Sequence, residues 1–457
     1  MDLWKDVLNS PTKIVAPMVD ASELPWRILS RRYGAQLCYT PMLHSNIFIK
    51  DPKYRKEALA TCDEDKPLIV QFCGNDPQII LQAAKMCEDF CCAIDINLGC
   101  PQAIAKRGHY GAFLQDEWPL IENIVQTLSG QLKIPVTCKI RRFETIEKTV
   151  KYAKMLERAG CSMLTVHGRT RDMKGPMTGI ADWTYVTAVR RAVSIPVISN
   201  GNIQCIQDVY RCLDETGAVG VMTAEGNLYN PAIFLGISPP VWEPAKEYLD
   251  LVEQYPCPLS YVRGHLFKLF HHLLSLPENN GIRIRLGEAN SLQLFDQIVE
   301  ELKIKYLPFH QGLEAWSCTT EEGTQNLILP PWLCQPYVRM NVEEHIKKVE
   351  ENSQAEDSCD SHKRVYQDAD GNPISRKKMK KLRRISRRPE KQAICEKSFF
   401  KCSNCVNPMG SKCNYQLCKK CCRDKCFLEN MDCNGHRILV RTRRNMAKYY
   451  ASTKSDQ

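Results

Sequence analysis

Eight short apolar runs, separated by segments of helical periodicity, constrain the fold of this chain more than any other feature of its sequence. Each run has four or five residues, the length of a short strand. Helical patterns over 78–90 and 145–159 lie between them, and Gly34 and Gly160 end helices just before the next run. The runs cover residues 14–18, 35–39, 68–72, 93–97, 136–140, 163–167, 197–200 and 219–222.

This alternation of strands and helices predicts parallel βαβ units and therefore an α/β fold. Eight such units favour a (β/α)8 TIM barrel, in which the strands close on themselves inside a ring of helices. An open, doubly wound sheet is the competing architecture. The dinucleotide-binding form of that sheet carries a GxGxxG turn after its first strand, and this sequence has none there.

The composition and the predicted secondary structure of the sequence change after the predicted barrel. A run of helical patterns predicts a small helical domain, and a connection follows that contains Pro and Trp and then becomes acidic and polar. A strongly basic stretch comes next, and nine of the 24 cysteines lie at or after Cys395. We therefore expect a barrel over 1–240, a helical domain over 241–312, a linker over 313–375, a basic segment over 376–391 and a cysteine-rich module over 395–445.

The formal net charge of the chain is +10, and +9 of it comes from the stretch between Lys363 and Lys397. A basic excess gathered in one segment indicates a polyanionic partner, most simply a nucleic acid. Such a run is also typical of nuclear-import signals, so we expect a cytoplasmic or nuclear location, or both. No apolar stretch of about 18 residues or more is present, and no membrane partner is expected. The sequence does not fix the oligomeric state, and a monomer is the default expectation.

Polar residues gather where the predicted strands end. In a (β/α)8 barrel the active site lies at the carboxyl ends of the strands, so these residues are the first candidates for chemistry. The set includes amides, a thiol, a lysine and two glycine-containing turns, where a packed core would be apolar. It consists of Pro17 and Met18, Gln71, Asn97 and Cys100, Lys139, His167, the turn at 200–202 and the turn at 224–226.

Several of these residues fit a phosphorylated, planar cofactor. The turns after the seventh and eighth predicted strands expose backbone N–H groups, which can cradle a phosphate. Lys139 would add positive charge near an anionic ring or a substrate carbonyl. The amide of Gln71 offers both a donor and an acceptor to a heterocycle. Together these features predict a flavin mononucleotide (FMN) site.

Five short motifs resemble the blocks of the tRNA-dihydrouridine synthase family, in the same order and at predicted strand ends. The most specific is Asn97-Leu-Gly-Cys-Pro101, which is followed by Lys106-Arg-Gly-His-Tyr-Gly-Ala112. The resemblance covers roughly residues 2–308 and implies a TIM barrel with a helical domain that contacts tRNA. The other motifs are Ala16-Pro-Met18, Cys138-Lys-Ile-Arg141, Val166-His-Gly-Arg-Thr170 and Asn200-Gly-Asn202.

The resemblance implies a mechanism that reduces uridine to 5,6-dihydrouridine in tRNA. NADPH or NADH reduces FMN, the reduced flavin gives a hydride to C6 of uracil, and Cys100 protonates C5. A cysteine thiol has a reference pKa of about 8.5, so it is mostly protonated at neutral pH and can donate a proton. The target base must leave the folded tRNA to reach the flavin. The eukaryotic members that the chain most resembles imply uridines 16 and 17 of the D-loop as targets.

The resemblance also assigns roles to individual residues. Asn97, Arg141 and Arg169 are expected to bind the substrate. Many family members carry Asp in place of Asn202 and Arg in place of Glu225, and a carboxylate beside a phosphate is unfavourable. We therefore expect backbone N–H groups to hold the phosphate and Glu225 to turn outward. The implied FMN contacts are Pro17, Met18, Val19, Gln71, Lys139, His167, Asn200, Gly201, Asn202, Ala224 and Glu225.

A dense set of cysteines near the end of the sequence predicts zinc binding. No secretory signal is evident at the N-terminus, so we expect reduced or metal-bound thiols rather than disulfides. The paired Cys-x2-Cys units at Cys402/Cys405 and Cys418/Cys421 are typical of zinc sites. The cluster is too short to bury a core, so metal would supply its folding energy. Cys422 belongs to the same cluster, and further candidate ligands are Cys413, Cys426, Cys433 and His436, enough for two tetrahedral sites whose pairing is open.

Two other functions are compatible with a barrel of this kind. A flavin barrel could act on a free pyrimidine, as dihydroorotate-type dehydrogenases do, but the helical domain and the basic segment argue against this. A non-catalytic RNA- or protein-binding module on a degenerate barrel would not take up FMN.

Overall fold

The computed structural model describes residues 2–316, 327–337, 339, 342–343, 345–347, 366–367, 373–374 and 400–453. These residues belong to two compact units, which divide between Arg388 and Pro389. The predicted basic segment, residues 376–391, lies outside the described residues, as does much of the predicted linker over 313–375. None of the described helices combines the length and the apolar character needed to cross a bilayer.

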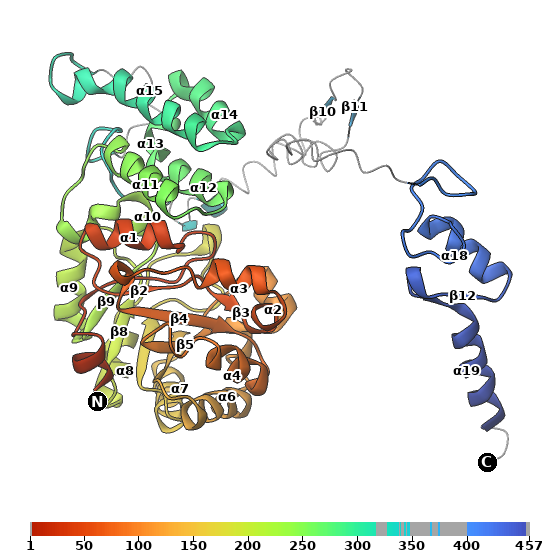
Figure 1. The fold of residues 1–457 in the computed structure, drawn as a ribbon. Helices are drawn as coiled ribbons and strands as arrows, with labels where there is room; N and C mark the ends of the chain where they lie inside the picture. Colours follow the sequence, from red (N-terminus) through yellow and green to blue (C-terminus); the bar gives the residue numbers. More distant parts are fainter. Residues whose placement is uncertain are drawn as a thin grey trace. The chain divides into compact units, whose positions relative to one another are not determined.

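Eight parallel strands form a barrel in the first unit (Figure 1). From β4 to β9 each strand pairs with the next one in the chain, and β1 pairs with β9. The Val15 N–H donates to the Leu37 carbonyl over 3.0 Å, which joins β1 to the chain entering β2 and closes the ring. This confirms the (β/α)8 barrel over the open sheet. The strands are β1 (Lys13–Val15), β2 (Cys38–Tyr39), β4 (Leu68–Cys73), β5 (Ala93–Leu98), β6 (Val136–Arg141), β7 (Met163–His167), β8 (Val197–Asn200) and β9 (Gly220–Thr223).

Some elements differ from their predicted bounds. The run over 35–39 forms a strand only at its end, because the Ala35 N–H still closes the preceding helix by donating to the Ser30 carbonyl. The helix predicted over 78–90 ends at Lys85, because the next N–H groups turn back to carbonyls three residues earlier. An additional short strand, β3 (Leu43–His44), pairs with β4.

Helices surround the barrel, and most of them bury apolar side chains, whereas α3 buries none. Helix α7 is typical: it begins after Thr145, whose hydroxyl accepts from the Lys148 N–H, and it buries Tyr152 and Leu156. The helices of the barrel are α1 (Leu24–Arg32), α2 (Ser45–Lys50), α3 (Pro52–Ala58), α4 (Pro77–Lys85), α5 (Ala103–Gly108), α6 (Trp118–Gln131), α7 (Ile146–Arg158), α8 (Thr184–Ala192), α9 (Ile206–Thr216) and α10 (Glu225–Tyr229).

A helical region follows the barrel and packs against it through α1. Trp26 and Leu29 of α1 share a buried cluster with Tyr248 and Phe295 of the helical region. The buried Glu23 carboxylate, just before α1, accepts from the Tyr248 hydroxyl at 2.6 Å. The helices are α11 (Trp242–Gln254), α12 (Leu259–Leu269), α13 (His271–Leu274), α14 (Asn280–Glu288) and α15 (Leu292–His310).

Residues 327–337 and 339, which we call the return segment, run back along the helical region. The Val241 N–H donates to the Trp332 carbonyl at 2.8 Å, and the Cys334 N–H donates to the Pro239 carbonyl at 2.9 Å. The Trp332 ring is buried and stacks on Tyr306 of α15. This stretch was predicted as linker, but its apolar side chains find partners on α15, so it is part of the folded unit.

The second unit is small and is built around cysteines. Helix α18 (Lys419–Leu428) and the hairpin β12 (Asp432–Cys433) and β13 (Ile438–Leu439) precede helix α19 (Val440–Thr453). Its buried cluster contains Leu417 and five cysteines, so few apolar side chains hold it together. A further two-stranded pair, β10 (Tyr366–Gln367) and β11 (Pro373–Ile374), belongs to the first unit.

Candidate active site at the carboxyl ends of the barrel strands

A chain of hydrogen bonds crosses the barrel from β6 to the loop that carries Cys100. The Asp95 carboxylate accepts from the Thr137 hydroxyl at 2.6 Å and from Gln71 Nε2 at 2.7 Å. Gln71 Oε1 then accepts from Asn97 Nδ2 at 2.8 Å. We call this chain, from Thr137 to Asn97, the amide relay. Burial raises the pKa of Asp95 to about 6, against the opposing effect of the hydrogen bonds from Thr137 and Gln71.

The amide relay ends on the backbone of the Cys100 loop. Asn97 Oδ1 accepts from the Cys100 N–H at 2.9 Å and from the Gly99 N–H at 3.2 Å. Gly111, at φ +67°, approaches the same loop so closely that a Cβ there would lie 2.9 Å from the Cys100 carbonyl oxygen. The Cys100 side chain is partly exposed and packs with Met42 and Phe113 against a small cluster around Tyr110. The loop is therefore fixed while Cys100 itself stays partly exposed.

Arg141, at the end of β6, braces this loop against the one after β7. Its Nε donates to the Gly99 carbonyl at 2.9 Å, and its Nη1 donates to the Thr170 carbonyl at 2.7 Å. Burial, and then the neighbouring Arg169, lower the pKa of Arg141 to about 10, so it stays charged at neutral pH. These contacts give Arg141 a structural task; its predicted contact with substrate stays a prediction.

Lys139, on β6, links the strands near Cys100 to β8 and β9 across the rim formed by the carboxyl ends of the barrel strands. Its Nζ donates to Asn200 Oδ1 at 2.9 Å, and Asn200 Nδ2 donates to the Met222 carbonyl at 2.8 Å. Burial, and then the charge of Arg141, lower the pKa of Lys139 to about 8. At neutral pH the lysine is therefore mostly charged but close to the point of losing its proton.

His167 and Arg169 form a polar group after β7. Arg169 Nη1 lies 3.1 Å from His167 Nε2, and since arginine only donates, this nitrogen must accept. Burial, together with the positive charges of Lys139 and Arg141, lowers the pKa of His167 well below its ordinary value, so the ring is neutral. Arg169 Nη2 also donates to Asn202 Oδ1 at 2.7 Å. The Asn202 side chain is therefore engaged in holding Arg169, which leaves its backbone for any ligand.

A cavity of about 700 Å³ opens above the ends of β7, β8 and β9, and we call it the β7–β9 cavity. Gly201 forms part of its wall at φ +115°, and a Cβ there would lie 2.7 Å from the Ala181 Cβ. The volume lies in the range of small-molecule sites. The lining includes His167, Arg169, the turn at 200–202, Ala224, Glu225 and, from the return segment, Tyr337 and Arg339.

The Glu225 carboxylate at the mouth of this cavity pairs with Arg339. Arg339 Nη2 donates to Glu225 Oε1 at 2.5 Å and Nε donates to Oε2 at 3.1 Å, and both side chains are about 40% exposed. Glu225 therefore meets a guanidinium that lies 114 residues later in the chain. The expected outward turn of Glu225 stays a prediction, and the ion pair supplies a neutralising partner that the sequence did not indicate.

The remaining predicted FMN contacts lie at the end of β1. The Met18 N–H donates to the Ser22 hydroxyl at 2.8 Å, and Pro17 is partly buried beside it. Val19 is 58% exposed and lines a second cavity of about 360 Å³, bordered by Tyr54 of α3 and Tyr261 of α12. Met42 lines this second cavity and also packs in the cluster of Cys100.

The structure thus brings most of the predicted residues together in two groups at the rim of the barrel, whereas Val19 lines the second cavity. His167, Asn200, Gly201, Asn202, Ala224 and Glu225 line the β7–β9 cavity, whereas Gln71, Asn97 and Cys100 share the amide relay. Two residues were missed. Asp95 was visible as a charge inside an apolar strand, but Arg339 gave no signal, because it lies in an irregular connection far from the barrel sequence.

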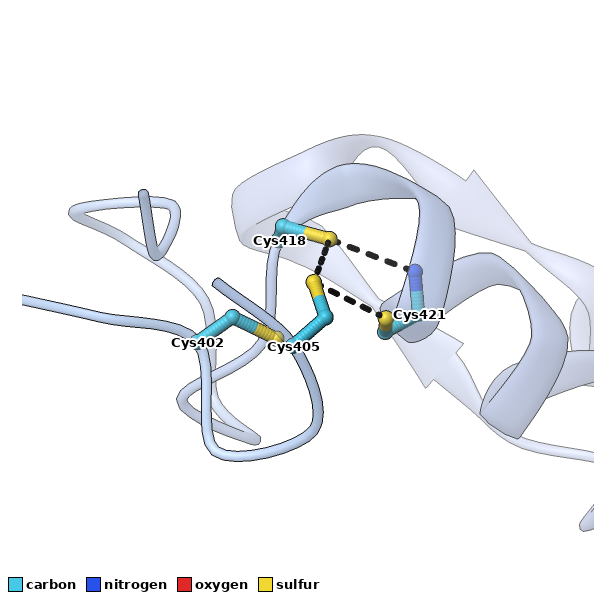
Figure 2. Close-up of side chains that lie close together, drawn as sticks. All are labelled: Cys402, Cys405, Cys418 and Cys421. Carbon is cyan, nitrogen blue, oxygen red and sulfur yellow. Dashed lines mark hydrogen bonds between the residues drawn. The ribbon is translucent and has the colours of Figure 1, made fainter. Parts of the chain in front are cut away.

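Four cysteines of the second unit lie close together (Figure 2). Cys405 Sγ lies 3.6 Å from both Cys418 Sγ and Cys421 Sγ, and the sulfurs of these three and of Cys402 all lie within 4.8 Å of one another. A zinc ion bound tetrahedrally at about 2.3 Å would hold its four sulfurs about 3.8 Å apart. The spacing therefore fits one tetrahedral site, made of the two Cys-x2-Cys units.

A second group interleaves with the first along the chain. The ligand atoms of Cys413, Cys422, Cys433 and His436 also lie within 4.8 Å of one another, and Cys433 Sγ is 3.7 Å from His436 Nδ1. Cys422, which the sequence placed in the same cysteine cluster, belongs to this group. Cys426, which was a candidate, lies outside it with its sulfur 4.0 Å from that of Cys422.

Comparison with known proteins gives consistent matches. The model of the "Dihydrouridine synthase (Dus)" family matches residues 14–278. A "tRNA-dihydrouridine(16/17) synthase [NAD(P)(+)]-like" protein of Mus musculus is 49% identical over 449 residues, which cover 97% of this chain and 91% of the relative. The "tRNA-dihydrouridine(16/17) synthase [NAD(P)(+)]" of Saccharomyces cerevisiae is 43% identical over 73% of this chain and 85% of its own. A human "tRNA-dihydrouridine(20a/20b) synthase [NAD(P)+]-like" protein is 34% identical over 66% of this chain and 91% of its own.

Proposed function

The chain belongs to the dihydrouridine synthase family, and from this membership we propose that it reduces uridine to 5,6-dihydrouridine in transfer RNA. The observation that carries the proposal is the arrangement of the strand-end rim. A loop fixed by the amide relay presents the Cys100 thiol, and Lys139 links that half of the rim to a cavity with cationic lining.

We propose FMN as the cofactor, held in the β7–β9 cavity. The cavity is large enough for a mononucleotide, and Arg339 and the glycine turn at 201 offer donors suited to a phosphate. Lys139 and His167 would lie toward the ring, where Lys139 offers charge and neutral His167 a hydrogen bond. When bound and reduced by NADPH or NADH, FMN would supply the hydride that the uracil C6 accepts.

The residues of the chain would supply the proton and the geometry. Cys100 is the proposed acid: its thiol gives a proton to C5 of the uracil ring, and a proton from solvent restores the thiol. The amide relay keeps the loop in place, while Asn97 and Arg169 would meet the substrate. Such a site needs the base outside the folded tRNA, so we propose that the enzyme acts on an extruded uridine.

We propose the D-loop, at uridines 16 and 17, as the target, because the relatives with 43–49% identity carry these positions in their names. The helical region and the basic stretch at 376–391 would supply phosphate contacts to the tRNA. The proposed location is the cytoplasm or the nucleus, and the proposed state is a monomer.

We further propose that the second unit binds two zinc ions. Cys402, Cys405, Cys418 and Cys421 would hold one ion, and the interleaved set that ends at His436 would hold the other. The buried cluster of this unit consists mainly of cysteines, so metal would provide much of its folding free energy.

The substitution Cys100→Ala tests the central role. We expect the variant to keep its yellow flavin and its affinity for tRNA and to lose dihydrouridine formation by about 100-fold or more, because the proton donor is gone. Dihydrouridine in tRNA is measured by mass spectrometry of digested nucleosides. Cys73→Ala is the matched control, since Cys73 is a buried thiol of the neighbouring cluster. Full activity of Cys100→Ala would remove this residue from the mechanism.

The choice of substrate is tested by mixing the reduced enzyme with tRNA or with free uridine and following the flavin absorbance. We expect rapid reoxidation by tRNA alone. Equal reoxidation by free uridine would favour a pyrimidine dehydrogenase, and failure of the protein to bind FMN would favour a non-catalytic module.

A further inference from the structure

Three arginines line the β7–β9 cavity, and they differ in how they are paired. Arg211 bonds to Asp208 at 2.8 Å, and Arg339 bonds to Glu225. Arg169 bonds to neutral acceptors, among them Asn202. Among the described lining residues there is thus one more cationic than anionic side chain, since His167 is neutral. An anion entering this cavity would be attracted.

Arg339 keeps donors available while it is paired. Its Nε and Nη2 face the two carboxylate oxygens of Glu225, in the fork geometry that arginine favours. Its Nη1 is 3.5 Å from the Gly175 carbonyl oxygen, at the long limit of a hydrogen bond. A guanidinium has five N–H donors, so the Nη1 side can take a stronger acceptor without breaking the pair with Glu225.

The return segment holds Arg339 in this position. Tyr337 stacks on Tyr229 of α10 with ring centroids 5.4 Å apart, and the Arg339 guanidinium lies 5.6 Å from the centre of the Tyr337 ring. His272 Nε2 lies 3.2 Å from the Pro336 carbonyl oxygen, which ties the segment to α13. The segment that brings the arginine is therefore anchored on both the barrel and the helical region.

We infer that Arg339 binds the phosphate of the flavin nucleotide in the β7–β9 cavity, with Glu225 as its positioning residue. The inference rests on the proposed function, because it takes FMN as the ligand. The phosphate oxygens would accept from Nη1 of Arg339 while Glu225 holds the other edge of the guanidinium. Arg339 lies outside residues 14–278, so the cavity is completed by a segment that the family model does not include.

The test compares FMN with riboflavin, which has the same ring system and no phosphate. Binding to the full-length apoprotein is followed by the quenching of flavin fluorescence. We expect Arg339→Ala to weaken FMN binding about 10- to 100-fold, the loss of a charged hydrogen bond, and to leave riboflavin binding unchanged. Arg285→Ala is the matched control, because Arg285 Nη2 forms a similarly exposed ion pair with Glu301 away from the cavity.

The outcomes separate three explanations. Equal weakening of FMN and riboflavin would show that Arg339 only shapes the cavity, and unchanged FMN binding would show no role; either result overturns the inference. Complete recovery of FMN affinity in the double variant Arg339→Ala, Glu225→Gln would mean that the arginine only neutralises the carboxylate, which also overturns it, whereas partial recovery supports direct contact. If the unaltered protein bound no FMN, the proposed function itself would fail.

Discussion

The Asp95 carboxylate fixes the orientation of two side-chain amides and, through them, one backbone loop. A carboxylate only accepts, so Gln71 must turn its Nε2 toward it and its Oε1 toward Asn97. Asn97 must then present its own oxygen to the Cys100 N–H. Each amide in the relay has a single orientation, because the two ends of the chain have fixed polarity.

The fixed order of donors and acceptors in the amide relay predicts that Asp95→Asn, a substitution with almost no change in volume, disturbs the active site. If the new amide keeps its oxygen on the Thr137 hydroxyl, its Nδ2 opposes Gln71 Nε2, and the rotation of Gln71 and Asn97 that relieves this costs the Cys100 N–H its acceptor. The other orientation keeps the bond from Gln71 but requires the Thr137 hydroxyl to accept instead of donate. We expect dihydrouridine formation to fall about 10- to 100-fold with flavin still bound, as measured in nucleoside digests. Thr137→Val removes one bond to Asp95 without reversing the relay and should keep most of the activity. Unchanged activity in Asp95→Asn would contradict the positioning role.

The pKa of Lys139, lowered to about 8, predicts a pH dependence of flavin binding. As pH rises through 8 the lysine loses its charge, so the affinity for the anionic nucleotide should fall between pH 7 and 9. Lys139→Met should bind FMN more weakly at pH 7 and show no such fall, because methionine does not titrate. Fluorescence titrations of both proteins across this range provide the measurement. A fall of equal size in the variant would assign the pH dependence to another group.

At the level of elements, the alternation of strands and helices was readable because apolar runs and helical periodicity are local patterns. The exact ends of the elements could not be predicted. The Ala35 N–H, for example, still closes α1 and so shortens β2, which only the hydrogen bonds of the structure reveal. The strand-end residues could be named because the barrel places every carboxyl end on one rim. The pairing of Glu225 with Arg339 could not be predicted, because no local sequence pattern links two residues so far apart.

The return segment depends on one large side chain. Trp332 is 5% exposed and packs on Tyr306 and Phe309. We expect Trp332→Ala to lower the free energy of unfolding by about 3–5 kcal/mol, the usual cost of removing a buried aromatic ring. Urea unfolding of the full chain measures this. Leu313→Ala, at a side chain 75% exposed, should change it by less than about 0.5 kcal/mol. Equal effects of the two substitutions would contradict a structural role for the segment.

At the scale of the whole molecule, two units depend on different sources of stability. The barrel and helical region bury many large apolar side chains, whereas the second unit buries mainly cysteines. The sequence predicted this contrast from cysteine spacing, and it left the ligand pairing open because spacing alone does not tell which cysteines meet.

We expect a strong chelator to unfold the second unit and leave the first intact. Limited proteolysis of the full chain should then cut within residues 400–453 and leave a stable fragment that retains flavin. Added zinc should restore resistance, and Cys418→Ser should mimic the chelator, with Cys92→Ser in the barrel as control. Resistance that persists after complete metal removal would show that the unit folds without metal.

The salt link between Glu225 and Arg339 has a consequence for the order of biogenesis. A ribosome that has just added Glu225 must still add 114 residues before the guanidinium exists. At about 5–20 residues per second this takes on the order of ten seconds. During that interval the Glu225 carboxylate at the mouth of the β7–β9 cavity lacks the Arg339 guanidinium, so this edge of the barrel reaches its final charge balance only after synthesis has passed residue 339.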